Sequence, residues 1–153
     1  MTDDAATLAD ELSTARADFL AAIDAVDPAA PAVVGEWSAR ELVAHLGYWA
    51  GHAVDVIHAV ETGRADDVGV GEPSVDDTNA TVARVARQTD LATVRKREAA
   101  SAQVLLERLA TMDPALLAVL LPDGATLAQG IREDGSEHYR EHTDDLRSAP
   151  SAR

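Results

Sequence analysis

The sequence contains no cysteine, which excludes disulfide bonds and thiolate metal sites. No apolar run approaches the roughly 18 residues that a membrane-spanning helix needs. Residues 1–10 carry acidic side chains and no lysine or arginine, which is unlike a secretory signal. These absences predict a cytoplasmic protein that has no membrane partner.

Basic residues are also scarce. The chain has 13 lysines and arginines against 27 aspartates and glutamates, which gives a formal net charge of −14. Nucleic-acid backbones and anionic membranes attract basic surfaces, so neither is an expected partner. We expect a small-molecule substrate, with a homodimer as an open alternative for assembly.

Length and composition indicate one globular domain. The chain has 153 residues, of which 46% are hydrophobic and 26% charged, a balance typical of folded soluble domains and not of disordered chains. We therefore assign residues 1–153 to a single domain, with its core in residues 5–147.

Helical periodicity dominates the chain, and no segment shows a convincing strand pattern. A first helix ends at Asp27-Pro28. A second begins at Ser38, because Ser38 and Glu41 match the Ser-x-x-Glu capping box, and Trp37 and Leu42 occupy the positions of a hydrophobic staple.

The second half of the chain predicts further helices. Residues 75–112 form either one bent helix or two, since Asp90 could cap a second. The last helix is expected from Thr126 to Arg147, weakened by Gly130 and Gly135. Residues 62–75, rich in glycine and acids, form a long connection or a lid. The predicted fold is an all-α four-helix bundle with one long crossover connection.

Three of the five histidines lie on apolar stripes of predicted helices. His45 occupies a core position of the second helix, and His138 and His142 share the inward face of the last helix, one turn apart. This i, i+4 spacing lets two imidazoles bind one metal ion, and a third from a facing helix would leave one coordination position open. Spacing alone leaves a second interpretation open, namely buried histidines that only form hydrogen bonds.

Other polar residues are weaker candidates. His52, seven residues after His45, is either a fourth ligand or a pocket residue, and Tyr48 and Asn79 are candidate catalytic groups near a pocket. Glu41 and Asp134, each one turn before a histidine, could orient the imidazole rings. The remaining candidates are expected to have structural roles: a surface histidine at His58, a packed tyrosine at Tyr139, and solvated helix ends at Asp76-Asp77 and Asp144-Asp145.

Two motifs resemble a known protein family. Residues 35–46 (GEWSARELVAHL) resemble the Trp-Ser-x-x-(Glu/Asp)-Leu-x-x-His-Leu signature of the DinB-like superfamily, and residues 137–142 (EHYREH) are similar to its late His-x-x-x-His. The resemblance implies a four-helix bundle with a divalent metal, zinc or nickel, held by His45, His138 and His142. It also extends to a subgroup containing the colibactin self-resistance hydrolase, through residues 137–139 and 77–79.

The resemblance implies several activities. Members of the superfamily include thiol-dependent transferases and isomerases that use mycothiol, bacillithiol or glutathione, some hydrolases, and many stress-inducible proteins. Mycothiol-dependent maleylpyruvate isomerases often carry Glu at the position of His138 and add a C-terminal domain, so their particular reaction is not implied. We expect a metal-dependent transferase, isomerase or hydrolase acting on a small electrophile; the alternative is a non-catalytic protein that sequesters a small molecule.

Overall fold

The structure is a computed structural model that describes residues 4–148. Over this range the chain is all-α, as predicted: it contains helices and two isolated β-bridges but no strands. The α-helices are α1 Ala5–Asp24, α2 Ala39–Glu61, α3 Val75–Arg87, α4 Leu91–Thr111, α5 Leu127–Asp134 and α6 Ser136–Ser148, and the 3-10 helices are η1 Ala65–Asp67 and η2 Pro114–Ala118. No helix among these residues is long and apolar enough to cross a membrane.

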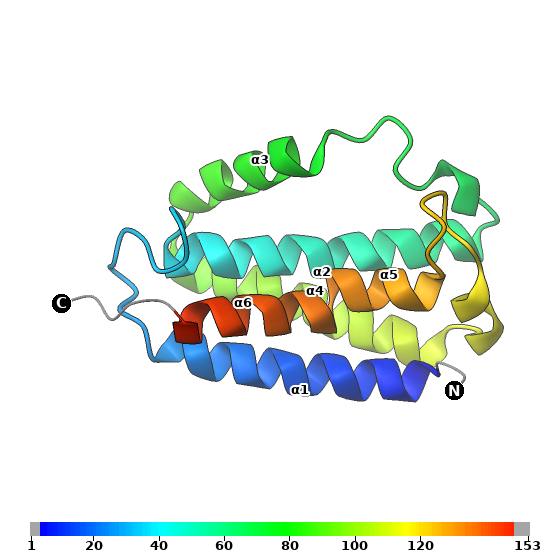
Figure 1. Cartoon of the computed structure of the whole chain (residues 1–153), viewed down its shortest axis with the longest axis horizontal. Coiled ribbons are helices and arrows are strands. Elements are labelled where there is room, and N and C mark those ends of the chain that lie inside the picture. The colour runs from blue at the N-terminus through cyan, green and yellow to red at the C-terminus, as the bar shows by residue number, and fades with distance from the viewer. Residues whose placement is uncertain (1–3, 149–153) are drawn as a thin grey trace.

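The bundle consists of α1, α2, α4 and the consecutive pair α5 and α6 (Figure 1). Helix α2 packs along α4, and α1 packs along α6. Leucine, valine and alanine side chains fill the centre together with Phe19, which is fully buried. Helix α3 lies outside this bundle and packs on α2, so the predicted third helix is two helices with different positions.

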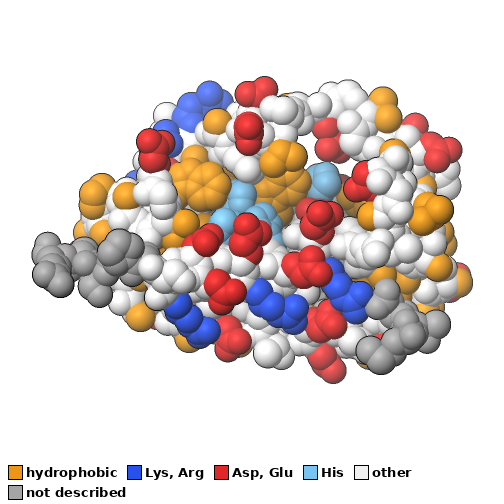
Figure 2. Space-filling model, viewed as in Figure 1, with side chains coloured by type: hydrophobic (Ala, Val, Ile, Leu, Met, Phe, Trp, Pro, Cys, Tyr) orange, Lys and Arg blue, Asp and Glu red, His pale blue; other side chains and the backbone are white. Residues whose placement is uncertain are grey.

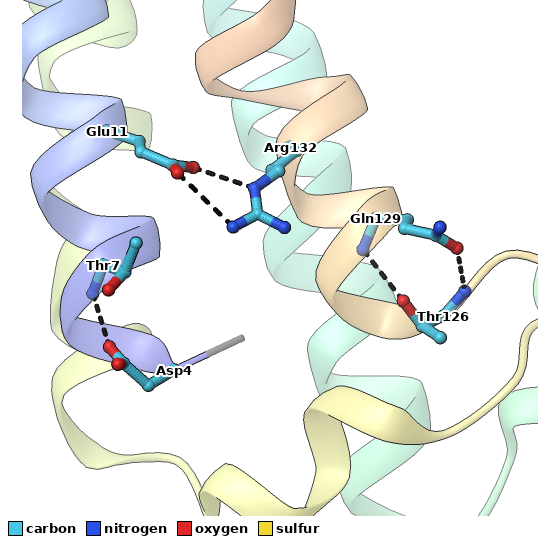
Figure 3. Close-up of polar contacts among 6 residues, drawn as sticks. All are labelled: Asp4, Thr7, Glu11, Thr126, Gln129 and Arg132. Atoms are coloured by element: carbon cyan, nitrogen blue, oxygen red, sulfur yellow. Dashed lines mark hydrogen bonds and ion pairs between the residues drawn. The ribbon is translucent and has the colours of Figure 1, made fainter. Parts of the chain in front are cut away.

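Side-chain caps explain where the helices begin. Asp90 accepts from the Thr93 N–H at 2.8 Å and starts α4, which decides between the bent helix and the helix pair. Thr126 and Gln129 form a complete, reciprocal capping box at the start of α5 (Figure 3). In the same view, Arg132 of α5 donates to Glu11 of α1 at 2.8 Å and ties α5 to the bundle.

The capping box predicted at Ser38 is only half formed. Ser38 Oγ accepts from the Glu41 N–H and caps α2, as expected. The Glu41 carboxylate, however, accepts from the Ser38 hydroxyl at 3.1 Å and from Arg87 at 3.3 Å. Glu41 therefore links the start of α2 to the end of α3 and does not close a box on the Ser38 backbone.

The predicted last helix is interrupted at Gly135, which separates α5 from α6. At this break a Cβ atom on Gly135 would lie 2.8 Å from the Ile131 carbonyl oxygen, closer than real Cβ contacts allow. Gly130, in contrast, lies within α5, and a Cβ there would meet only the end of the Leu121 side chain, at 3.0 Å. Gly135 is therefore required by the break, whereas Gly130 is an ordinary weak position in a helix.

These two glycines give a matched pair of substitutions. Gly135→Ala should lower the free energy of unfolding by about 1–3 kcal/mol, because the backbone must move to admit the methyl group. Gly130→Ala should be neutral or raise it by up to ~1 kcal/mol, because alanine is the better helix former and the Leu121 side chain can turn aside. Urea denaturation of both variants measures the difference; equal effects would contradict the strict need for glycine at 135.

Candidate metal centre

Three histidine rings from two helices converge at one place. His45 comes from α2, and His138 and His142 come from α6; one nitrogen of each lies within 4.8 Å of the others. The Nε2 atoms of His45 and His138 are 2.8 Å apart. The His142 ring centroid is 5.1 Å from that of His45 and 4.9 Å from that of His138. The three histidines singled out by their stripe positions are therefore neighbours in the fold.

The three rings differ in burial. His45 is 4% exposed, whereas His138 and His142 are half-buried. Both α6 histidines turn towards α2, where they meet His45, but the fully buried face of α6 consists of Ser136, Tyr139, Thr143 and Leu146. The two histidines lie beside that face, and Figure 2 shows histidine and hydrophobic side chains together on the surface between α3 and α6. The cluster is thus accessible to a small molecule from one side.

Burial makes these imidazoles hard to protonate. Loss of solvation, followed by repulsion from His138 and His142, lowers the pKa of His45 to about 3. The same desolvation, with His142 as the charged neighbour, lowers the pKa of His138 to about 4. Both rings are consequently neutral at physiological pH, the form in which imidazole donates a lone pair to a metal.

Hydrogen bonds orient one ring in a way that the sequence analysis missed. His142 Nδ1 donates to the Asp145 carboxylate at 3.0 Å, which leaves Nε2 free to bind a ligand. The expected orienting groups do not serve this role: Glu41 pairs with Ser38 and Arg87, and Asp134 pairs with His52. The i, i+3 spacing of His142 and Asp145 was visible in the sequence, but Asp144-Asp145 was interpreted as a solvated helix end.

Two tryptophan side chains lie beside the histidine cluster. The Trp37 ring lies 4.5 Å from His45 and 6.4 Å from His142, and the Trp49 ring lies 6.4 Å from His138. Trp37, predicted as part of a staple at the start of α2, thus also covers the histidines. These apolar rings shield part of the cluster from water and contribute to the desolvation that lowers the pKa values of His45 and His138.

The weaker candidates form a separate group beside Trp49. His52 Nδ1 lies 2.6 Å from Asp134 Oδ2, and this carboxylate raises the pKa of His52. Asn79 of α3 accepts from the Trp49 indole N–H at 2.9 Å, so it holds α3 in place. His52 belongs to the lining of a neighbouring cavity of about 370 Å³ and not to the three-histidine group, which argues against its role as a fourth ligand.

Three other residues lie outside the histidine cluster. His58 is exposed on α2, as predicted. Tyr48 is 43% exposed and borders the same cavity as His52. Tyr139 does more than pack, because its hydroxyl donates to the buried Glu98 carboxylate at 2.8 Å.

The donor set fits a divalent metal ion. Three imidazoles can supply three lone pairs, and tetrahedral zinc with bonds of about 2.0–2.1 Å needs ligand nitrogens roughly 3.4 Å apart. The observed nitrogens, between 2.8 Å and 4.8 Å apart, reach that spacing by small side-chain adjustments. His45 Nδ1 is buried and has no hydrogen-bond partner among the described residues.

The bundle and its clustered imidazoles define the class: a DinB-like helical domain whose three histidines are placed to bind a metal. The chain belongs to the family described as the mycothiol maleylpyruvate isomerase N-terminal domain, whose model matches residues 9–147.

Among solved structures, the chain is similar to an uncharacterised protein from Escherichia coli UTI89, with a TM-score of 0.80 at 13% identity. The match covers 95% of this chain and 92% of that one, and at this identity it bears on the fold alone. A comparison with curated proteins finds no match.

The lowered histidine pKa values predict acid sensitivity of the metal-free protein. The unfolded chain protonates these rings near pH 6.5, but the folded chain does so only near pH 3 for His45 and 4 for His138. The unfolded state therefore binds more protons between these values, so their contribution is complete above pH 6.5 and is lost as the pH falls. We expect a loss of on the order of 1 kcal/mol per pH unit for each ring.

Chemical denaturation in the presence of a chelator, at several pH values from 7.5 to 4.5, measures this dependence. His45→Leu should flatten it, whereas the control His58→Gln, at an exposed position, should leave it unchanged. An identical pH dependence in the wild type and His45→Leu would show that His45 is not a buried neutral ring.

Proposed function

We propose that this protein binds a divalent metal, zinc or nickel, through His45, His138 and His142, and that it is a metal-dependent enzyme acting on a small electrophilic molecule. The observation that carries the proposal is the convergence of three imidazoles with nitrogens within 4.8 Å of one another. Three protein ligands leave a coordination position for an exogenous group, which is the composition of catalytic sites and not of structural ones.

The nucleophile comes from outside the chain. A divalent metal held there supplies a Lewis acid that makes a bound thiol or water more acidic. The chain has no cysteine, so a thiol must be a separate small molecule, and the name of the family points to mycothiol as one such thiol. Thiol transfer or isomerisation is therefore the first reaction to test, and hydrolysis is the second.

The chain's own residues supply the surroundings of the reaction. Trp37 and Trp49 shield part of the cluster from water, and Asp145 orients His142. His52, positioned by Asp134, is the nearby group best suited to move a proton, because Asp134 accepts its Nδ1–H and its Nε2, 3.5 Å from Glu72 Oε2, borders the cavity. This assignment places proton transfer on α2, seven residues from His45.

Metal binding should stabilise the protein in a pH-dependent manner. We expect one metal ion per chain and a higher melting temperature with zinc or nickel at pH 7.5, because the ion binds the folded state. The gain should shrink towards zero near pH 5, where protons compete for the same lone pairs. His142→Ala should abolish it at both values, and the matched control His58→Ala should retain it.

Calorimetric titration and melting curves of tag-free protein make this measurement. Equal melting temperatures with and without a series of divalent metals would reject the metal site and favour a metal-free protein that sequesters a small molecule. Where metal binds, conjugation of mycothiol or glutathione to 1-chloro-2,4-dinitrobenzene, with and without chelator, tests the thiol reaction. In that assay His52→Ala should lower the rate without reducing metal content.

A further inference from the structure

A second cavity lies beneath α3, away from the histidines. It has a volume of about 330 Å³ and lies between α2, α3 and α4, open to solvent on one side. Its walls are mainly apolar or small, including Ala44 and Gly47 of α2, Val82 and Val85 of α3, and Val94 of α4. None of the three clustered histidines lines it. Its size and lining are those of a small-molecule pocket.

The cavity exists because α3 is held over the bundle mainly by polar contacts. Only Ala83 and Ala86 of α3 are buried, and Val85 is 47% exposed although it lines the cavity. Two hydrogen bonds link α3 to α2, from Trp49 to Asn79 in the first half of α3 and from Arg87, its last residue, to Glu41. The unfilled apolar space lies below the second half of α3, next to Val82 and Val85.

The edge of this cavity is basic in an otherwise acidic protein. Residues 84–97 contain five of the 13 basic residues and only one of the 27 acidic ones, Asp90, whose carboxylate caps α4. Basic side chains appear in Figure 2 near the end of α3. Arg97 itself lines the cavity and has no hydrogen-bond or ion-pair partner among the described residues.

The charges around the cavity select one kind of ligand. The Glu98 carboxylate in its wall is already bound by Arg16 and Tyr139, so it does not oppose an anion strongly. On the other side of Tyr48, the neighbouring cavity is lined by the acidic residues Asp55, Asp67 and Glu72. An anionic group is therefore attracted to the Arg97 side and repelled from the other.

We propose that the cavity beneath α3 binds a small amphiphilic anion, an apolar or aromatic body with one carboxylate or sulfonate group. The body lies between α3 and the α2–α4 surface, and the anionic group pairs with Arg97. An unpaired guanidinium beside an apolar pocket offers charge-assisted hydrogen bonds to such a group. This site is separate from the three histidines and does not depend on the metal proposal.

The probe for this site is 1-anilinonaphthalene-8-sulfonate, titrated into the whole folded chain and followed by fluorescence. We expect one saturable site per chain. Arg97→Gln should weaken binding by about tenfold through loss of a charge-assisted contact. Lys96→Gln removes the same charge next to Arg97 but outside the lining, so its affinity should stay within twofold of the wild type.

Further variants separate the apolar and ionic contributions. Val82→Trp and, at a more exposed position, Val85→Phe should fill the cavity and abolish binding. The uncharged analogue N-phenyl-1-naphthylamine should respond to these two variants but not to Arg97→Gln. Melting curves and near-ultraviolet circular dichroism confirm that each variant is folded, since a loosened bundle also binds such dyes.

Two results would overturn the proposal: equal affinity in Arg97→Gln and Lys96→Gln, or unchanged dye binding in a folded Val82→Trp or Val85→Phe variant. Dye binding should be unaffected by His142→Ala and by zinc. A failure of metal binding is thereby distinguished from a failure of this site, and displacement of the dye by zinc would place it at the histidines instead.

Discussion

The buried carboxylate of Glu98 sets the geometry on which the histidine cluster depends. Glu98 is 1% exposed and accepts two hydrogen bonds from Arg16 of α1, at 2.6 and 2.9 Å, and one from the Tyr139 hydroxyl of α6. Because successive helical residues point about 100° apart, fixing Tyr139 towards Glu98 turns the preceding residue, His138, towards α2. One polar contact in the core therefore determines which way α6 presents its histidines.

Glu98 also lies where α2 and α4 approach each other closely. A Cβ atom on Gly47 would lie 2.9 Å from the Glu98 Cα atom, so glycine at this position lets the two helices pack together two residues after His45. A buried ion pair offers little net stability over an apolar core, because both groups lose their hydration. Its contribution here is orientation. It links α1, α4 and α6 near the place where His45 of α2 meets the two histidines of α6.

The sequence was sufficient for the features that follow local rules. Periodicity placed His45, His138 and His142 on stripes that meet, and Ser38 and Asp90 identified helix starts. It was insufficient where a choice between partners depended on tertiary packing. Asp134 was assigned to His138, one turn away, yet it pairs with His52 of α2, because the break at Gly135 changes the direction of the chain between them. Glu98 resembled any solvated helix charge, and nothing local indicated that Arg16 and Tyr139 would surround it.

The strong negative charge of the chain has opposite consequences for its two candidate ligands. A protein with a net charge of −14 attracts cations from solution, which favours the approach of divalent metal ions to the histidine cluster. The same field repels anions, and an anionic ligand can approach favourably only where the charge is locally reversed. Residues 84–97 provide such a reversal at the edge of the cavity beneath α3. The uneven placement of the few basic residues thus gives the two proposed ligands, a cation and an anion, separate places on one acidic chain.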